Sequence, residues 1–185
     1  MFSYSRNSRA ATLVLQLACA AALLAGSSVY AADHSHSFEL TAISNSPGGE
    51  ALVKGQYDIA AKELAQHHPT LYAGELSTNR CVVLAMTHQL EAARVECNAA
   101  VHDAESKIAS VPSFVNSASS GYDNYLALVY SNRAVVNWLS KDAVAAQADL
   151  KRAAAVAPKA EFVARNQVAF QSRDGAVQVA VASKS

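Results

Sequence analysis

Apolar and small residues recur at helical spacing along most of the chain, and this pattern predicts an all-α protein. The pattern begins near Glu50 and continues to Gln171. The stretch before it, 32–49, contains Ser, Asn, Pro and a Gly pair without a sustained apolar period. We therefore expect a flexible arm over 32–49, with at most a short strand or turn, and a tail over 172–185.

The first 31 residues have the pattern of a signal peptide. Arg6 and Arg9 precede an apolar run over 10–25, and small and polar residues follow it. Val29 and Ala31 are the small residues that a signal peptidase needs, so we expect cleavage after Ala31. The run is shorter than the roughly 20 residues that cross a bilayer, so we expect no retained membrane span. These features predict an exported protein, located in the periplasm or secreted.

One spacing of small and apolar residues occurs three times in the helical region. The three sets are Tyr57, Ala60 and Leu64, then Leu90, Ala93 and Cys97, then Ala143, Ala146 and Leu150. A second shared string begins at Asn79 and again at Asn132, ahead of the second and third sets. Each unit is therefore expected to be two helices joined by a tight turn.

This arrangement resembles the tetratricopeptide repeat (TPR) family, in which helix pairs repeat about every 34 residues. Small residues such as Cys81 and Ala134 in the first helix stand where the family needs close helix packing, as do Ala93 and Ala146 in the second. The resemblance implies a short α-solenoid of antiparallel helix pairs. Its expected parts are a partial unit over 50–68, a unit over 74–101, an insert over 102–124, a unit over 125–158 and a closing helix over 159–171.

The resemblance also implies a concave face that binds an extended peptide or a partner helix. The residues expected to line this groove are Asn79, Val82, Met86, Ser131, Asn132, Val135 and Trp138. Asn79 and Asn132 would offer side-chain amides to a peptide backbone. Trp138 would either supply an aromatic anchor or pack under the insert or the closing helix.

Cys81 and Cys97 remain after the predicted cleavage, and in the repeat geometry they face each other across one helix pair. Export permits a disulfide between them. Two unpaired thiols that fill the core as small apolar groups are an equal alternative.

Composition and charge exclude several classes of function. Hydrophobic residues make up 51% of the chain and charged residues 16%, which suits a folded domain rather than a disordered chain. The 15 basic and 15 acidic residues balance, so no net field favours nucleic acid. No catalytic motif and no cofactor-binding motif occurs, so we expect neither an enzyme nor a bound cofactor.

Cleavage after Ala31 would create the terminus Ala32-Asp33-His34, which can bind Cu(II) or Ni(II) through amine, amide and imidazole nitrogens. His36 could assist. The competing interpretation is an arm whose histidines have no role.

The sequence thus predicts a non-enzymatic protein-interaction module in the periplasm whose partner is an unidentified protein or peptide. The alternative is a small exported metal-binding or redox-responsive protein that uses Ala32-Asp33-His34 or Cys81 and Cys97. A third prediction is a homo-oligomer, joined through the half-unit near Tyr57.

Overall fold

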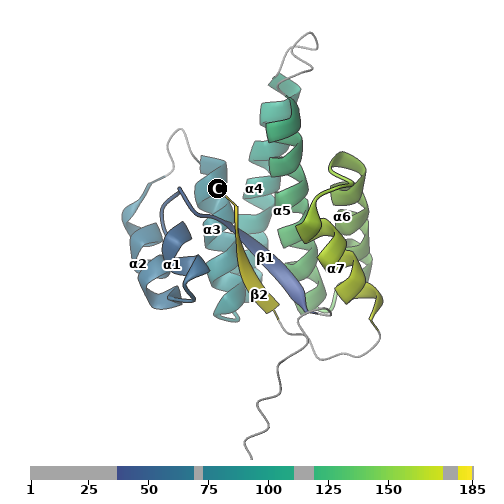
Figure 1. The fold of residues 1–185 in the computed structure, drawn as a ribbon. Helices are drawn as coiled ribbons and strands as arrows, with labels where there is room; N and C mark the ends of the chain where they lie inside the picture. The colour runs from purple at the N-terminus through teal and green to yellow at the C-terminus, as the bar shows by residue number, and fades with distance from the viewer. Residues whose placement is uncertain (1–36, 69–72, 111–118, 173–178, 185) are drawn as a thin grey trace, which may run out of the picture. The chain divides into compact units, whose positions relative to one another are not determined.

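The computed structural model describes residues 37–68, 73–110, 119–172 and 179–184, all within the unit Asp33–Ser185. These residues are mostly helical, with a small parallel sheet on one face of the helices (Figure 1). The elements in chain order are β1 Phe38–Ile43, α1 Gly49–Val53, α2 Tyr57–Gln66, α3 Ala73–Met86, α4 Leu90–Ser110, α5 Ser119–Leu139, α6 Ala143–Val156, α7 Glu161–Gln171 and β2 Val179–Lys184. The predominance of helix is as predicted, while the sheet was not expected.

The helices form three pairs, α1–α2, α3–α4 and α5–α6, and every pair has the same turn. Gly55, His88 and Lys141 stand at equivalent places with φ of 70°, 61° and 65°. In each turn the next residue donates its N–H to a carbonyl five residues back, as Gln89 does to Leu84 at 2.8 Å. This is the hydrogen bond of a Schellman motif, which ends the first helix and reverses the chain.

The second helix of each pair begins at a residue of the predicted repeat. These first residues are Tyr57, Leu90 and Ala143. One turn further along, Ala60, Ala93 and Ala146 are fully buried. A methyl side chain lets two helices approach closely, so alanine is favoured where the helices of a pair contact each other.

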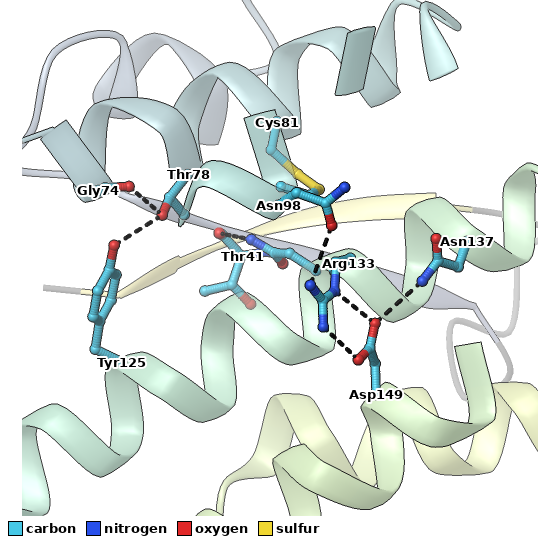
Figure 2. The surroundings of a disulfide bond; sticks show 11 residues. Thr41, Gly74, Thr78, Cys81, Asn98, Tyr125, Arg133, Asn137 and Asp149 are labelled. Carbon is cyan, nitrogen blue, oxygen red and sulfur yellow. Dashed lines mark hydrogen bonds and ion pairs between the residues drawn. A yellow bond between two sulfur atoms is a disulfide. The ribbon is translucent and has the colours of Figure 1, made fainter. Parts of the chain in front are cut away.

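Cys81 of α3 and Cys97 of α4 form a disulfide, with their Cα atoms 5.1 Å apart (Figure 2). The equivalent residues of the next pair are Ala134 and Leu150, which are both buried apolar side chains. The disulfide therefore occupies a place that ordinary core packing fills in α5–α6.

The predicted arm over 32–49 allowed a short strand, but residues 38–49 are packed against the helices rather than free of them. The strand β1 lies there with five of its six residues buried, and α1 begins at Gly49. Phe38, Leu40 and Ala42 alternate with polar Glu39 and Thr41, which is the pattern of a strand, but it spans only five residues beside a stretch rich in Ser, Asn, Pro and Gly. Residues 32–36 of the arm lie outside the described residues.

The predicted tail is wrong for residues 179–184, which form β2. This strand pairs with β1 in parallel, from Phe38 opposite Val179 to Ile43 opposite Lys184. Parallel pairing between the two ends of a chain leaves no local turn signal in the sequence, which explains why the strand was not predicted.

The predicted insert over 102–124 is largely helical where it is described. Helix α4 continues to Ser110 and α5 begins at Ser119, so both helices extend beyond the bounds of the expected units. The extension is packed, since Ala104 and Leu126 are buried in one cluster with Val129. In the part of the chain that the structure describes, no helix is long and apolar enough to cross a bilayer.

We predict that removing the disulfide lowers the free energy of unfolding by about 3 kcal/mol, because the bond closes a loop of 16 residues in the unfolded chain. The measurement is urea unfolding of the wild type with and without reductant, followed by the fluorescence of Trp138. The control is the double variant Cys81→Ala and Cys97→Ala, which should unfold at the reduced midpoint in both conditions. An unchanged wild-type midpoint on reduction would contradict this prediction.

Candidate functional site

Three asparagine side chains bind the backbone of β1. Asn166 accepts the N–H of Glu39 at 2.6 Å and donates to its carbonyl at 2.8 Å. Asn132 makes the same two bonds with Thr41, both at 2.8 Å. Asn79 does so with Ile43, at 2.8 and 3.0 Å. We call Asn79, Asn132 and Asn166 the asparagine ladder.

Each residue of the ladder belongs to a different helix on the same face of the protein. Asn79 lies in α3, Asn132 in α5 and Asn166 in α7, and all three are at most 2% exposed. A side-chain amide carries one acceptor and two donor hydrogens, so it can pair with a residue of a strand as a neighbouring strand would. The ladder thus binds one edge of β1 through the main chain alone.

The remaining hydrogens of two ladder amides are also used. Asn79 donates to the carbonyl of Pro47 at 3.0 Å, and Asn166 donates to the hydroxyl of Ser131 at 2.8 Å. These extra bonds help to fix the orientation of the two amides independently of their bonds to β1, because a buried amide with unpaired hydrogens is costly. Ser131, a predicted groove residue, therefore acts as a support for Asn166.

The sequence indicated two of the three asparagines. Asn79 and Asn132 were expected to offer amides to a peptide backbone, and they lie against the backbone of this chain's own β1. Asn166 was missed because it falls in the predicted closing helix. Its signal was its position 34 residues after Asn132, close to the 33-residue offset between Tyr57 and Leu90.

The other predicted groove residues lie beneath or beside the sheet. Val82 and Val135 are fully buried, and Met86 at the end of α3 is partly exposed. Trp138 is partly exposed and packs between two phenylalanine rings, Phe38 of β1 at 5.6 Å and Phe170 of α7 at 4.8 Å. Trp138 therefore contacts both the strand and the closing helix in this structure.

An ion pair fixes the register of β1 on the ladder. Arg165, next to Asn166 in α7, donates through two nitrogens to the two carboxylate oxygens of Glu39. This hydrogen bonding raises the pKa of Arg165. A slip of β1 by one residue would move every side chain to the opposite face of the strand and break this pair.

The second edge of β1 is paired with β2. Successive residues of a strand direct their backbone groups to opposite edges. Since Glu39, Thr41 and Ile43 bond the ladder, the backbone groups of residues 38, 40 and 42 face β2. Both edges of β1 are therefore paired, one with side chains and one with a strand.

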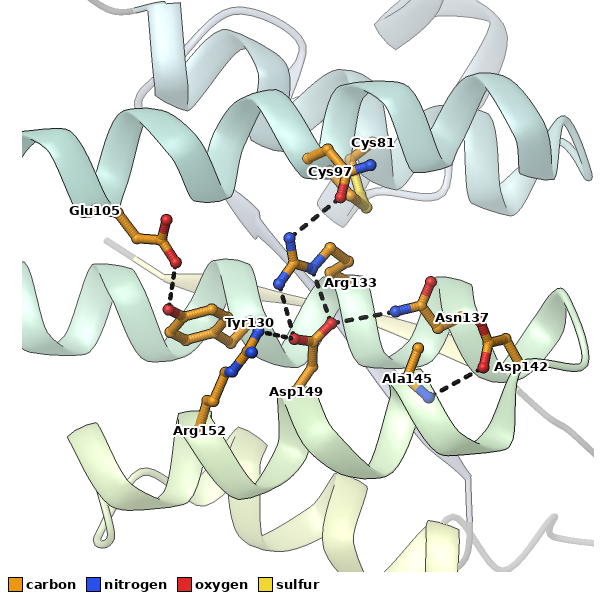
Figure 3. Close-up of polar contacts among 11 residues, drawn as sticks. Cys81, Cys97, Glu105, Tyr130, Arg133, Asn137, Asp142, Ala145, Asp149 and Arg152 are labelled. Atoms are coloured by element: carbon orange, nitrogen blue, oxygen red, sulfur yellow. Dashed lines mark hydrogen bonds and ion pairs between the residues drawn. A yellow bond between two sulfur atoms is a disulfide. The ribbon is translucent and has the colours of Figure 1, made fainter.

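A second polar cluster lies between α4, α5 and α6, away from the ladder (Figure 3). Arg133 donates two bonds to the buried carboxylate of Asp149, each at 2.8 Å, and one to Asn98 at 3.1 Å. Arg80, its equivalent in α3, donates to the carbonyls of Leu64 and His67. Both arginines thus bridge neighbouring helices.

Tyr130 of α5 extends this cluster. Its hydroxyl donates to Glu105 at 2.5 Å, and the guanidinium groups of Arg133 and Arg152 lie 5.6 and 5.8 Å from its ring centre. Burial, together with the bond to Glu105, raises the pKa of Tyr130 to about 12. This residue is held in its neutral form through the physiological range.

Potential metal ligands do not cluster in the described residues. No group of three or more His, Cys, Asp or Glu side chains there could hold a metal ion. The predicted metal site at Ala32-Asp33-His34, with His36, lies outside the described residues. Cys81 and Cys97 are joined to each other.

The fold and site define a mostly helical chain whose helices bind a strand through asparagine side chains. Comparison with protein-family models, with curated proteins and with solved structures gave no significant match.

We predict that Asn132→Ala lowers the free energy of unfolding by about 2–4 kcal/mol, because the N–H and carbonyl of Thr41 remain buried without partners. Urea unfolding gives the loss, and hydrogen exchange should become faster at the amide of Thr41. The matched control is Asn98→Ala, which removes an exposed bond and should cost less than about 1 kcal/mol. Equal losses in the two variants would contradict this role of Asn132.

We predict that Tyr130 makes stability depend on pH between about 10 and 12. The tyrosine pKa is near 10 in an unfolded chain, so the unfolded state releases this proton first as the pH rises. The contribution of Tyr130 to the free energy of unfolding is complete below pH 10 and is lost as the pH rises toward 12. Urea unfolding at several pH values should show a smaller loss for Tyr130→Phe than for the wild type; parallel curves would refute the assignment.

Proposed function

We propose that this chain is a non-enzymatic protein-interaction module that binds an extended segment of a partner protein on the face formed by α3, α5 and α7. In this proposal the helix pairs are organised as a short TPR-like solenoid. Support comes from the shared turn at Gly55, His88 and Lys141 and from the common register of the second helices.

The asparagine ladder is the observation that carries the proposal. Its six hydrogen bonds reach only backbone atoms of β1, so they do not depend on which side chains the bound strand carries. A face that holds a strand in this way suits extended polypeptide, as in recognition by strand addition. The chain's own β1 already occupies the ladder, so a partner segment would join a surface that includes this strand.

The proposal places the protein outside the cytoplasm, in the periplasm. The pattern of residues 1–31 supports export. The disulfide between Cys81 and Cys97 is compatible with an exported protein, because such bonds persist in oxidising compartments.

A photo-crosslinker at Met86 tests the proposal. Met86 is partly exposed and packs against the cluster that contains the β1 residues, whereas Val95 of α4 is 69% exposed and outside that cluster. We expect benzoyl-phenylalanine at Met86 to give a discrete crosslinked partner in an extract of the exported compartment, and at Val95 to give none.

Mass spectrometry of the crosslinked product should then map the contact to one short segment of the partner, and a synthetic peptide of that segment should bind the wild-type chain. Identical products from both positions, or a segment that does not bind as a peptide, would overturn the proposal. Thermal unfolding of the two crosslinker variants checks that each is folded.

A further inference from the structure

The outer edge of β1 is a strand-binding surface, and in this structure β2 occupies it. The parallel register runs over six residue pairs, from Phe38 with Val179 to Ile43 with Lys184. Strand β1 itself is fixed from the other side by the asparagine ladder and by the pair of Glu39 with Arg165. The edge offered to a second strand is therefore rigid and ordered in advance.

The two strands differ in how the helices hold them. Strand β1 packs against α1, α3, α5 and α7, whereas β2 packs mainly against β1 and α1 (Figure 1). The ladder reaches β1 only, so β2 receives none of those six bonds. The backbone pairing with β1 holds β2 in the sheet.

We propose that β2 is an internal competitor for a partner strand, and that the partner segment binds in parallel to β1 in the place of β2. This inference rests on the proposed function and names its partner. The sequence of β2 is Val-Ala-Val-Ala-Ser-Lys. We therefore expect the partner to be an extended segment of small and β-branched residues with little charge. Backbone pairing along the edge supplies the affinity in recognition of this kind.

The tether of β2 explains how such a site is regulated. Seven residues, 172–178, join β2 to α7. A short tether of this kind gives an effective concentration in the millimolar range, so a free peptide competes poorly until β2 is weakened. The wild-type chain is therefore self-occupied, and partner binding releases the C-terminal strand.

Proline substitutions test the two edges of β2 independently. The register, together with the direction of the β1 backbone groups, makes the N–H of Ala182 face β1 and the N–H of Val181 face away. Proline has no N–H, so Ala182→Pro removes a group that pairs with β1. Val181→Pro is the matched control, because it introduces the same ring without removing a group that faces β1.

The probe is a fluorescent synthetic peptide of residues 177–185, and its binding to the full-length proteins is followed by anisotropy. We expect Ala182→Pro to bind the peptide at least tenfold more tightly than the wild type and than Val181→Pro. Bound peptide should restore slow hydrogen exchange at the amides of Leu40 and Ala42. A peptide N-methylated at the position of Ala182 should not bind, whereas one methylated at the position of Val181 should.

Ala180→Pro provides a second variant on the same edge and keeps the test decisive if Ala182→Pro does not fold. Equal affinities for all variants, or binding that is insensitive to N-methylation, would overturn the inference. A wild-type dimer that Ala182→Pro dissociates would also overturn it, because β2 of a second copy would then be the occupant. If Met86 still crosslinks a partner while the peptide fails to bind, only this inference falls, and the proposed function stands.

Discussion

Hydrogen bonding between three asparagine side chains and the backbone of β1 is the constraint on which the described fold depends. Two residues of a strand advance about 6.7 Å, while packed helices lie about 8–10 Å apart. The amides of α3, α5 and α7 must therefore converge to meet alternate residues of one strand. Asn79, Asn132 and Asn166 are short and buried, so their positions and that of β1 determine each other. The helix pairs and the strand are specified together.

The helix pairs were predictable because their signals are local. Alanine at Ala60, Ala93 and Ala146 marks close helix contact, and the same spacing marks where each second helix begins. The facing positions of Cys81 and Cys97 followed from this register, although sequence alone left bonded and free thiols equally open. What could be predicted is therefore the part of the fold whose contacts lie within one helix pair.

The sheet could not be predicted because its signals are distant and polar. Thr41 and Asn132 are 91 residues apart, and Glu39 and Asn166 are 127 apart. The alternation of Phe38, Leu40 and Ala42 with Glu39 and Thr41 is a strand pattern, but it is short and lies next to the loop-like stretch 44–49. Two asparagines were identified as backbone-binding groups, but no pattern in the sequence indicates that the backbone belongs to the same chain. The sequence therefore indicated part of the site, Asn79 and Asn132, but neither Asn166 nor the strand that the site binds.

The two strands make unequal contributions to this architecture. Strand β1 is bound by side chains from three helices, so removing it would leave buried amides without partners. Strand β2 adds a second strand beside β1, and the six hydrogen bonds of the ladder are all made to β1. Its removal exposes one strand edge, a surface that proteins commonly cover or pair. The helices thus require β1, whereas β1 requires a neighbour but not one particular neighbour, and that difference allows β2 to be exchanged.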